Sequence, residues 1–304
     1  MNFRPLAVIA LGILPALLAQ ETPRPSGAKP IAPGQRVLFL GDSITYAGGY
    51  VVEFERWFAT TPGAAGVEVI NVGLSSETVS GLSEEDHAEG RFPRPDLHER
   101  LARVLAAVRP QVVFACYGMN DGIYLPLDEA RFARFCEGVA WLHATVEATG
   151  ARIIHLTPPV FDPNEKTKSY RDYDQVLARY AEWLLAQRAR GWEVIDLHGP
   201  MRTQLDERRR SDPAFRFAPD GVHPGAEGHA LMGAQVIGYF SPGATAPADD
   251  PTRAALFRRR MELRRDAWLT LTKHTRPGVA AGLPLEEATR QAAAITEQLR
   301  SKAP

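Results

Sequence analysis

A serine, an aspartate and a histidine stand in two short motifs far apart in the chain, and together they have the chemistry of a nucleophilic triad. Ser43 follows Gly41-Asp42 at the end of an apolar run. A serine at such a strand-to-helix turn can present its hydroxyl beside the N–H groups of the following helix. A serine hydroxyl is a weak nucleophile and needs a base within hydrogen-bond reach. Taken alone, the triplet is sufficiently explained as a helix N-cap.

The second motif, Asp220-Gly221-Val222-His223-Pro224, contains such a base and a carboxylate to orient it. An imidazole can accept the serine proton, while a carboxylate on its other nitrogen fixes the tautomer and stabilises the imidazolium. The spacing allows Asp220 and His223 to come from one loop, because Gly221 permits a tight turn. Taken alone, this motif is at least as typical of a turn with a surface histidine.

Two further positions have the chemistry of oxyanion donors. Gly73, in Asn71-Val72-Gly73, can bring a backbone N–H close to a ligand because it has no side chain. Asn120, in Gly118-Met119-Asn120-Asp121, offers a side-chain amide, and the backbone N–H of Ser43 would be a third donor. Glycine and asparagine are also common turn residues, so neither position is decisive by itself.

Short apolar segments that alternate with helical patterns are expected to position these residues. The predicted strands are 36–40, 67–72, 111–117, 152–156 and 193–197, and the predicted helices are 50–59, 97–108, 127–148 and 170–190. Strands alternating with helices predict right-handed crossovers and a parallel sheet covered on both faces. We therefore expect an α/β fold, a three-layer α/β/α sandwich over residues 34–241. Three of the motifs directly follow predicted strands, and the carboxyl ends of parallel strands share one edge of a sheet.

The joint pattern is far more specific than any one motif. Gly41-Asp42-Ser43-Ile44, Asn71-Val72-Gly73, Gly118–Asp121 and Asp220–Pro224 occur in the order and placement of the SGNH/GDSL hydrolase blocks, and over residues 34–241 the chain resembles that family. The resemblance implies a flavodoxin-like sandwich with a five-stranded parallel sheet and a Ser–His–Asp mechanism without metal or cofactor. It assigns catalysis to Ser43, Asp220 and His223, and oxyanion binding to Ser43, Gly73 and Asn120. Asp42 and Asp121 are expected to hold backbone rather than to transfer protons.

Composition and the chain ends suggest where the protein acts. The formal net charge is −1, which gives no global attraction to nucleic acid or anionic lipid. Residues 1–19 have the pattern of a signal peptide, and their apolar run is shorter than the roughly 20 residues that span a bilayer. We expect a secreted or periplasmic protein without stable membrane insertion, in which residues 20–33 form a proline-rich linker. Residues 250–304 are expected to form a helical extension whose arginines lie on a solvated face.

The cysteines suggest no chemical role. Cys116 and Cys136 either pair as a disulfide or remain two buried thiols, and their spacing resembles no metal site.

Export, near-neutral charge and the lack of a long apolar lid favour a polar, accessible ester. Because members of the resembling family include carbohydrate acetylesterases, the leading hypothesis is hydrolysis of small acyl esters, above all acetyl esters, on a small molecule or oligosaccharide. The alternatives are a lipase, thioesterase or lysophospholipase acting on longer acyl chains, and a noncatalytic carbohydrate-binding relative. Tyr46, Tyr117 and Tyr124 lie near the motifs, and Arg91 lies in the loop 83–94; these residues either shape a sugar subsite or serve in packing.

Overall fold

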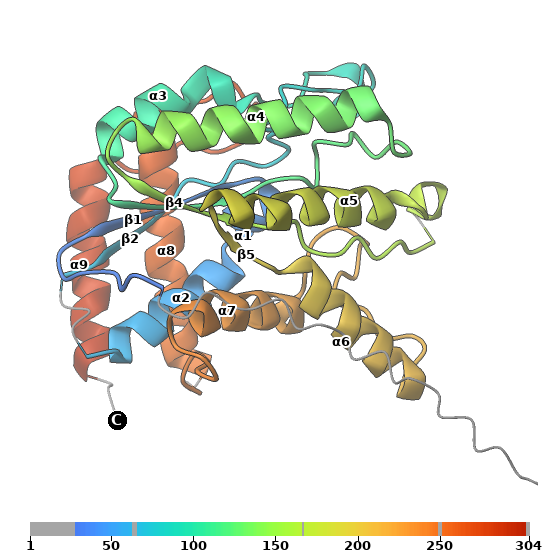
Figure 1. The fold of residues 1–304 in the computed structure, drawn as a ribbon. Helices are drawn as coiled ribbons and strands as arrows, with labels where there is room; N and C mark the ends of the chain where they lie inside the picture. The colour runs from blue at the N-terminus through green and yellow to red at the C-terminus, as the bar shows by residue number, and fades with distance from the viewer. Residues whose placement is uncertain (1–27, 63–65, 166, 249–250, 302–304) are drawn as a thin grey trace, which may run out of the picture.

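A five-stranded parallel sheet forms the centre of the computed structural model, which describes residues 28–62, 66–165, 167–248 and 251–301 (Figure 1). Its strands are β1 (Arg36–Gly41), β2 (Glu68–Asn71), β3 (Val112–Cys116), β4 (Arg152–Leu156) and β5 (Glu193–Ile195). Their order is β2-β1-β3-β4-β5, and each neighbouring pair is parallel. This is the flavodoxin-like order, with the switch point between β1 and β3. The predicted fold class is confirmed.

The apolar runs form strands because both faces of the sheet are covered. Val37, Leu38 and Phe39 of β1 are completely buried, although successive side chains point to opposite faces. On one face Phe39 stacks on Phe114 of β3, with ring centroids 4.6 Å apart. A strand with one solvated face would have alternated polar and apolar residues instead.

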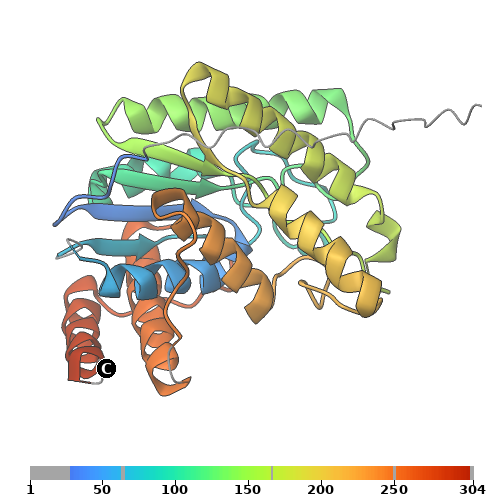
Figure 2. The same ribbon diagram turned by 60° about the horizontal axis from the view of Figure 1, so that its bottom comes forward.

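Helices cover the two faces of the sheet (Figures 1 and 2). On one side are α3 (Leu97–Val108), α4 (Glu129–Glu147) and α5 (Tyr173–Ala186), and on the other α2 (Gly49–Thr60) packs against α7 (Ala226–Phe240). The remaining elements of this part are α1 (Ser43–Ala47), α6 (His198–Ser211) and the 3-10 turns η1 (His87–Gly90), η2 (Lys168–Tyr170) and η3 (Gln187–Arg190). The predicted helix 170–190 is therefore divided, since α5 ends at Ala186 and continues as η3.

The predicted ranges contain neither of the two longer helices α6 and α7, nor the short helix α1. The amphipathic pattern of α6 is weak, since Met201 and Leu205 are its only buried large apolar residues and its last turn is rich in arginine. In α7, glycines lower the intrinsic helix propensity. Gly233 is needed for packing, because a Cβ there would lie 2.5 Å from the Cβ of Glu53 in α2.

The C-terminal extension consists of α8 (Pro251–Thr272) and α9 (Leu285–Ser301), which pack against each other. Helix α8 also lies against the edge strand β2 and contacts α2 and α3 (Figures 1 and 2). The expectation of a solvated arginine face is partly wrong. Arg258 and Arg259 are exposed, but Arg253 and Arg265 are each only 7% exposed because they face the main domain.

The predicted signal peptide, residues 1–19, and residues 20–27 of the predicted linker lie outside the described residues. Within the described part of the chain, no helix has both the length and the apolar character that crossing a membrane requires. Cys116 in β3 and Cys136 in α4 are both free thiols.

Candidate active site

The side chains of Ser43, His223 and Asp220 form a chain of hydrogen bonds. Nε2 of His223 lies 2.8 Å from Oγ of Ser43, and Nδ1 of the same ring lies 2.6 Å from Oδ2 of Asp220. The side chains of His223 and Asp220 are 47% and 56% exposed, so the group lies open to solvent. The fold thus brings together all three residues of the predicted triad, at the edge where the strands end.

The turn between β1 and α1 places Ser43. Oδ1 of Asp42 accepts a hydrogen bond of 2.9 Å from the N–H of Ile44, so Asp42 is the N-cap of α1 and Ser43 its first residue. A glycine is needed just before this turn, because a Cβ on Gly41 would lie 2.7 Å from the carbonyl oxygen of Cys116. Burial raises the pKa of Asp42 to about 7, although the backbone hydrogen bond and the nearby His223 oppose the rise.

Asp220 holds the histidine loop as well as the imidazole. Its Oδ1 accepts from the N–H groups of Val222 and His223, over 2.9 and 2.7 Å, while its Oδ2 bonds the ring. Partial burial raises the pKa of Asp220, but these hydrogen bonds outweigh it and leave the pKa below its usual value. Gly221 has a φ of +91°, the left-handed conformation that the tight turn requires. The carboxylate therefore remains ionised beside the imidazole.

Asn120 is held with its amide oxygen and nitrogen in defined directions. Oδ1 accepts from Nη1 of Arg94 over 2.9 Å and from the hydroxyl of Tyr124 over 3.3 Å. Nδ2 donates to the carbonyl oxygen of Glu77 over 3.2 Å. A side-chain amide nitrogen carries two N–H groups, so this contact leaves Asn120 a second donor.

The backbone N–H of Gly73, a predicted oxyanion donor, has a hydrogen-bond partner in the structure. It donates to Oδ1 of Asn71 over 2.8 Å, so the expected oxyanion donor is already engaged by a side chain two residues earlier. The glycine is required for another reason, since a Cβ at this position would lie 2.3 Å from the backbone nitrogen of Tyr46 in α1. In this structure Gly73 thus allows the close approach of the loop after β2 to the helix that carries Ser43.

The four residues predicted near the substrate occupy different environments. Tyr117 is buried, and its hydroxyl bonds Glu77 over 2.7 Å, which is a packing role. Arg91 is exposed on the loop after η1. Tyr124 is partly buried and contacts Asn120, while Tyr46 lies in α1, three positions after the serine.

Several charged residues behind the site were not predicted. Glu77 and Arg100 form an ion pair that is almost completely buried, and Arg100 also donates to the carbonyl of Val72 over 2.8 Å. Arg94 pairs with Glu84 and orients Asn120. No local pattern marks these residues, because each partner comes from a separate segment. Among the described residues, no three His, Cys, Asp or Glu side chains are grouped so as to hold a metal ion.

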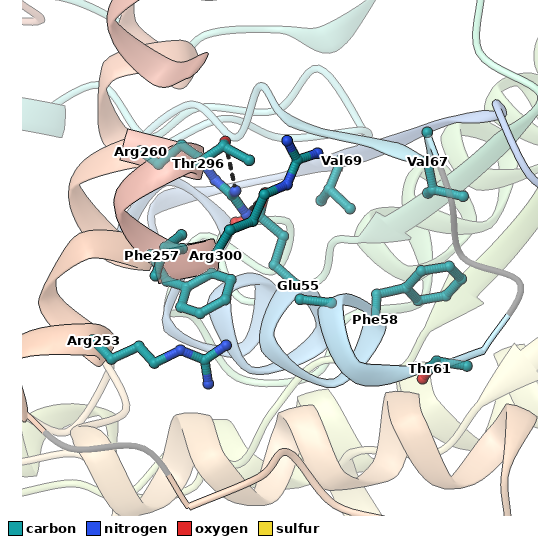
Figure 3. A pocket seen from close by; sticks show the side chains of 13 residues that line it. Glu55, Phe58, Thr61, Val67, Val69, Arg253, Phe257, Arg260, Thr296 and Arg300 are labelled. Carbon is teal, nitrogen blue, oxygen red and sulfur yellow. Dashed lines mark hydrogen bonds and ion pairs between the residues drawn. The ribbon is translucent and has the colours of Figure 1, made fainter. Parts of the chain in front are cut away.

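A cavity of about 340 Å³ lies elsewhere, between α2, α8 and α9 (Figure 3). Its lining comes from the end of α2, the start of β2 and the C-terminal helices, and includes Glu55, Phe257 and Arg260. The start of β2 is at the amino edge of the sheet, opposite the edge that carries the triad. None of the predicted site residues lines this cavity, so it is separate from the candidate active site.

Known proteins share the part of the chain that carries these residues. The sequence pattern of the GDSL-like lipase/acylhydrolase family matches residues 39–231. An acetylxylan esterase from Geobacillus stearothermophilus is 26% identical over an alignment 226 residues long, which covers 66% of this chain and 92% of that protein.

Solved structures share the fold. The acetylxylan esterase Axe2 from Geobacillus stearothermophilus aligns over 69% of this chain and 96% of its own, with 21% identity and a TM-score of 0.50. A gut microbial diltiazem-metabolizing enzyme aligns over 70% of this chain with 21% identity and a TM-score of 0.55. The alignment covers 48% of that enzyme, so this chain spans about half of its length.

Proposed function

Because the chain belongs to the GDSL-like lipase/acylhydrolase family of carboxylic ester hydrolases, we propose that Ser43, His223 and Asp220 are its catalytic triad. The predicted family is confirmed by a match that includes all three residues. The observation that carries the proposal is the 2.8 Å contact between Nε2 of His223 and Oγ of Ser43. This is the geometry in which a general base can take the proton of an attacking hydroxyl.

The proposed reaction transfers an acyl group to water in two steps. His223 removes the proton of Ser43 as Oγ attacks the ester carbonyl, and the imidazolium then protonates the departing alcohol. Water, deprotonated by His223, attacks the acyl-enzyme, and the collapse of the second intermediate releases the acid and returns the proton to Ser43. Asp220 keeps the imidazole in the required tautomer through its 2.6 Å contact with Nδ1.

The oxyanion is proposed to bind the N–H of Ser43 and the side-chain amide of Asn120. Gly73 can join them only by sharing its N–H between the ligand and Oδ1 of Asn71, or by releasing that contact. The oxyanion therefore has two donors that do not depend on any rearrangement of Asn71.

We propose small acyl esters of carbohydrates, above all acetyl esters, as the substrates. The similarity to an acetylxylan esterase supports this choice, since the alignment includes 92% of that protein. The open position of the triad supports it as well, because the 47% exposed side chain of His223 is within reach of a substituent on a bulky polysaccharide. The signal-peptide pattern of residues 1–19 leads us to propose action outside the cytoplasm, where such polymers occur.

Acetate release from acetylated xylo-oligosaccharides, measured beside p-nitrophenyl esters of increasing acyl length, tests this function. We expect acetyl esters to react best, and Ser43→Ala to lose both the acylation burst and labelling by a fluorophosphonate while it remains folded. A strong preference for long acyl chains would favour a lipase or thioesterase instead. An unlabelled Ser43 in the wild-type protein would contradict the triad and favour the noncatalytic carbohydrate-binding alternative.

A further inference from the structure

The helix that carries Ser43 is too short to satisfy its own backbone. Helix α1 has five residues, Ser43–Ala47, and the last carbonyl groups of any helix lack intrahelical partners. The backbone N–H of Gly48 bonds the carbonyl of Ile44 over 3.2 Å. The carbonyl groups of Thr45 and Tyr46 accept hydrogen bonds from side chains that belong to other segments.

One of these side chains comes from the C-terminal extension. Nη1 of Arg265 in α8 donates to the carbonyl oxygen of Tyr46 over 2.8 Å, across 219 positions of sequence. Its guanidinium carbon lies 3.9 Å from the centroid of the Tyr46 ring, and its Nε donates to Asp266 over 2.8 Å. A cation at the carboxyl end of a helix also interacts favourably with the helix dipole. Arg265 is therefore bound to both the backbone and the side chain of one residue of α1.

The carbonyl group of Thr45 is also linked to α8, through the side chain of Asn71. Nδ2 of Asn71 donates to the carbonyl oxygen of Thr45 over 2.6 Å and lies 3.4 Å from Sδ of Met261. Met261 precedes Arg265 by four positions, so the two side chains share one face of the helix. The end of α1 thus rests on α8 at Tyr46 directly and at Thr45 through Asn71.

We propose that Arg265 is a positioning residue for the nucleophile: by holding the carboxyl end of α1, it keeps Oγ of Ser43 within hydrogen-bond reach of His223. This inference rests on the proposed function of Ser43. The family match ends at residue 231, so Arg265 would be a contribution of the extension to the active site rather than a part of the family domain.

Arg264 provides a matched control one position earlier. Like Arg265, it joins α8 to the main domain, because its guanidinium pairs with Glu68 of β2. Glu68 is the first residue of β2, at the edge of the sheet opposite the triad. Loss of either arginine removes one anchor of α8, but only the loss of Arg265 removes a contact to α1.

The test compares Arg265→Met, Arg265→Lys and Arg264→Met with the wild-type protein, well below the unfolding temperature of each. The readouts are kcat and KM for p-nitrophenyl acetate, the rate of fluorophosphonate labelling of Ser43, and hydrogen exchange of the Tyr46 and Gly48 amides. We expect Arg265→Met to lower kcat and the labelling rate by roughly 10- to 100-fold with little change in KM, since small misplacement of a reacting group is costly. Exchange of both amides should become faster. Arg265→Lys should recover part of the rate, because an ammonium still donates to a carbonyl.

Arg264→Met should match the wild type in kcat, labelling and exchange at these two amides. The proposal is overturned if folded Arg265→Met has the same kcat and the same amide exchange as Arg264→Met. A wild-type protein that neither hydrolyses the ester nor becomes labelled would instead refute the proposed function. In that event, hydrogen exchange would still test whether Arg265 stabilises α1. Unchanged exchange in Arg265→Met would refute this stabilisation, and faster exchange would support it.

Discussion

Nη1 of Arg94 donates to Oδ1 of Asn120 over 2.9 Å, while the same guanidinium pairs with Glu84. The contact determines the orientation of the side-chain amide, because only its oxygen can accept from the guanidinium. Because the oxygen faces Arg94, the nitrogen is the group available to a developing oxyanion. Arg94 is 8% exposed and does not need to touch the substrate to have this effect.

Arg94→Met should lower kcat less than Asn120→Ala does. Loss of an oxyanion donor in Asn120→Ala is expected to reduce kcat by about 10²–10³. Arg94→Met keeps the amide but not its orientation, and loss of one hydrogen bond to a charged group corresponds to about tenfold. Steady-state kinetics on p-nitrophenyl acetate would measure both, with thermal unfolding as the check on folding. An unchanged rate in Asn120→Ala would remove Asn120 from the mechanism.

Asp220→Asn should retain the fold and lose most of the activity. Asparagine can still accept from the N–H groups of Val222 and His223, as Oδ1 of the aspartate does. Its NH₂ group, however, cannot accept from Nδ1 of the imidazole or stabilise the imidazolium. The expected fall in kcat is on the order of 10⁴, the effect of this substitution in a serine protease triad. A kcat within a few-fold of wild type would show that Asp220 does not support the base.

Gly73→Ala should disturb the nucleophile although it adds one methyl group. The new Cβ would lie 2.3 Å from the backbone nitrogen of Tyr46, so α1 must shift. We expect destabilisation of about 1–3 kcal/mol, as for overpacking, together with a marked loss of kcat. Gly238→Ala is the control, because a Cβ there meets nothing within 4 Å. Neither the free energy of unfolding nor kcat should fall in this variant. Urea unfolding and steady-state kinetics would compare the two variants. Equal stability and equal kcat would show that Gly73 does not lie as close to α1 as the structure indicates.

Asp42→Asn should remove a pH dependence of stability. The buried carboxyl has a pKa of about 7 against 3.8 for an unperturbed aspartate, so the folded protein holds this proton more tightly than the unfolded chain. Stability from this group therefore falls as pH rises between these two values, by up to about 4 kcal/mol at 1.36 kcal/mol per pKa unit. Asparagine keeps an acceptor for the N–H of Ile44 and does not ionise.

Urea unfolding at about pH 4 and about pH 8 would measure this effect. The free energy of unfolding of Asp42→Asn, relative to wild type, should increase at the higher pH. Parallel curves for the two proteins would place the pKa of Asp42 near its ordinary value.

The sequence predicted the elements best where a local period marks them. The bounds of β4 and α3 agree with the predicted 152–156 and 97–108, because continuous burial and one apolar helix face determine them. The contact between Ser43 and His223 could also be predicted, because the motifs that contain them match those of a known family.

Other features depend on partners that no local pattern reveals. The N–H of Gly73 was predicted as an oxyanion donor, and no local pattern reveals that it donates to the side chain of Asn71. The Arg100–Glu77 pair joins residues 23 positions apart, and the inward direction of Arg265 depends on α1, at the other end of the chain. Periodicity shows which faces are apolar, but it does not show which charged side chain a distant carbonyl will meet.

The position of α8 against β2 also bears on solubility. Among the described residues, strand β2 lies at the end of the sheet and pairs with β1 alone, so its other side presents backbone groups that another chain can bind. Helix α8 packs along β2 and shields this side. A protein shortened before Pro251 should therefore self-associate through the uncovered strand, and selection against aggregation gives a reason to retain the extension that is independent of the reaction.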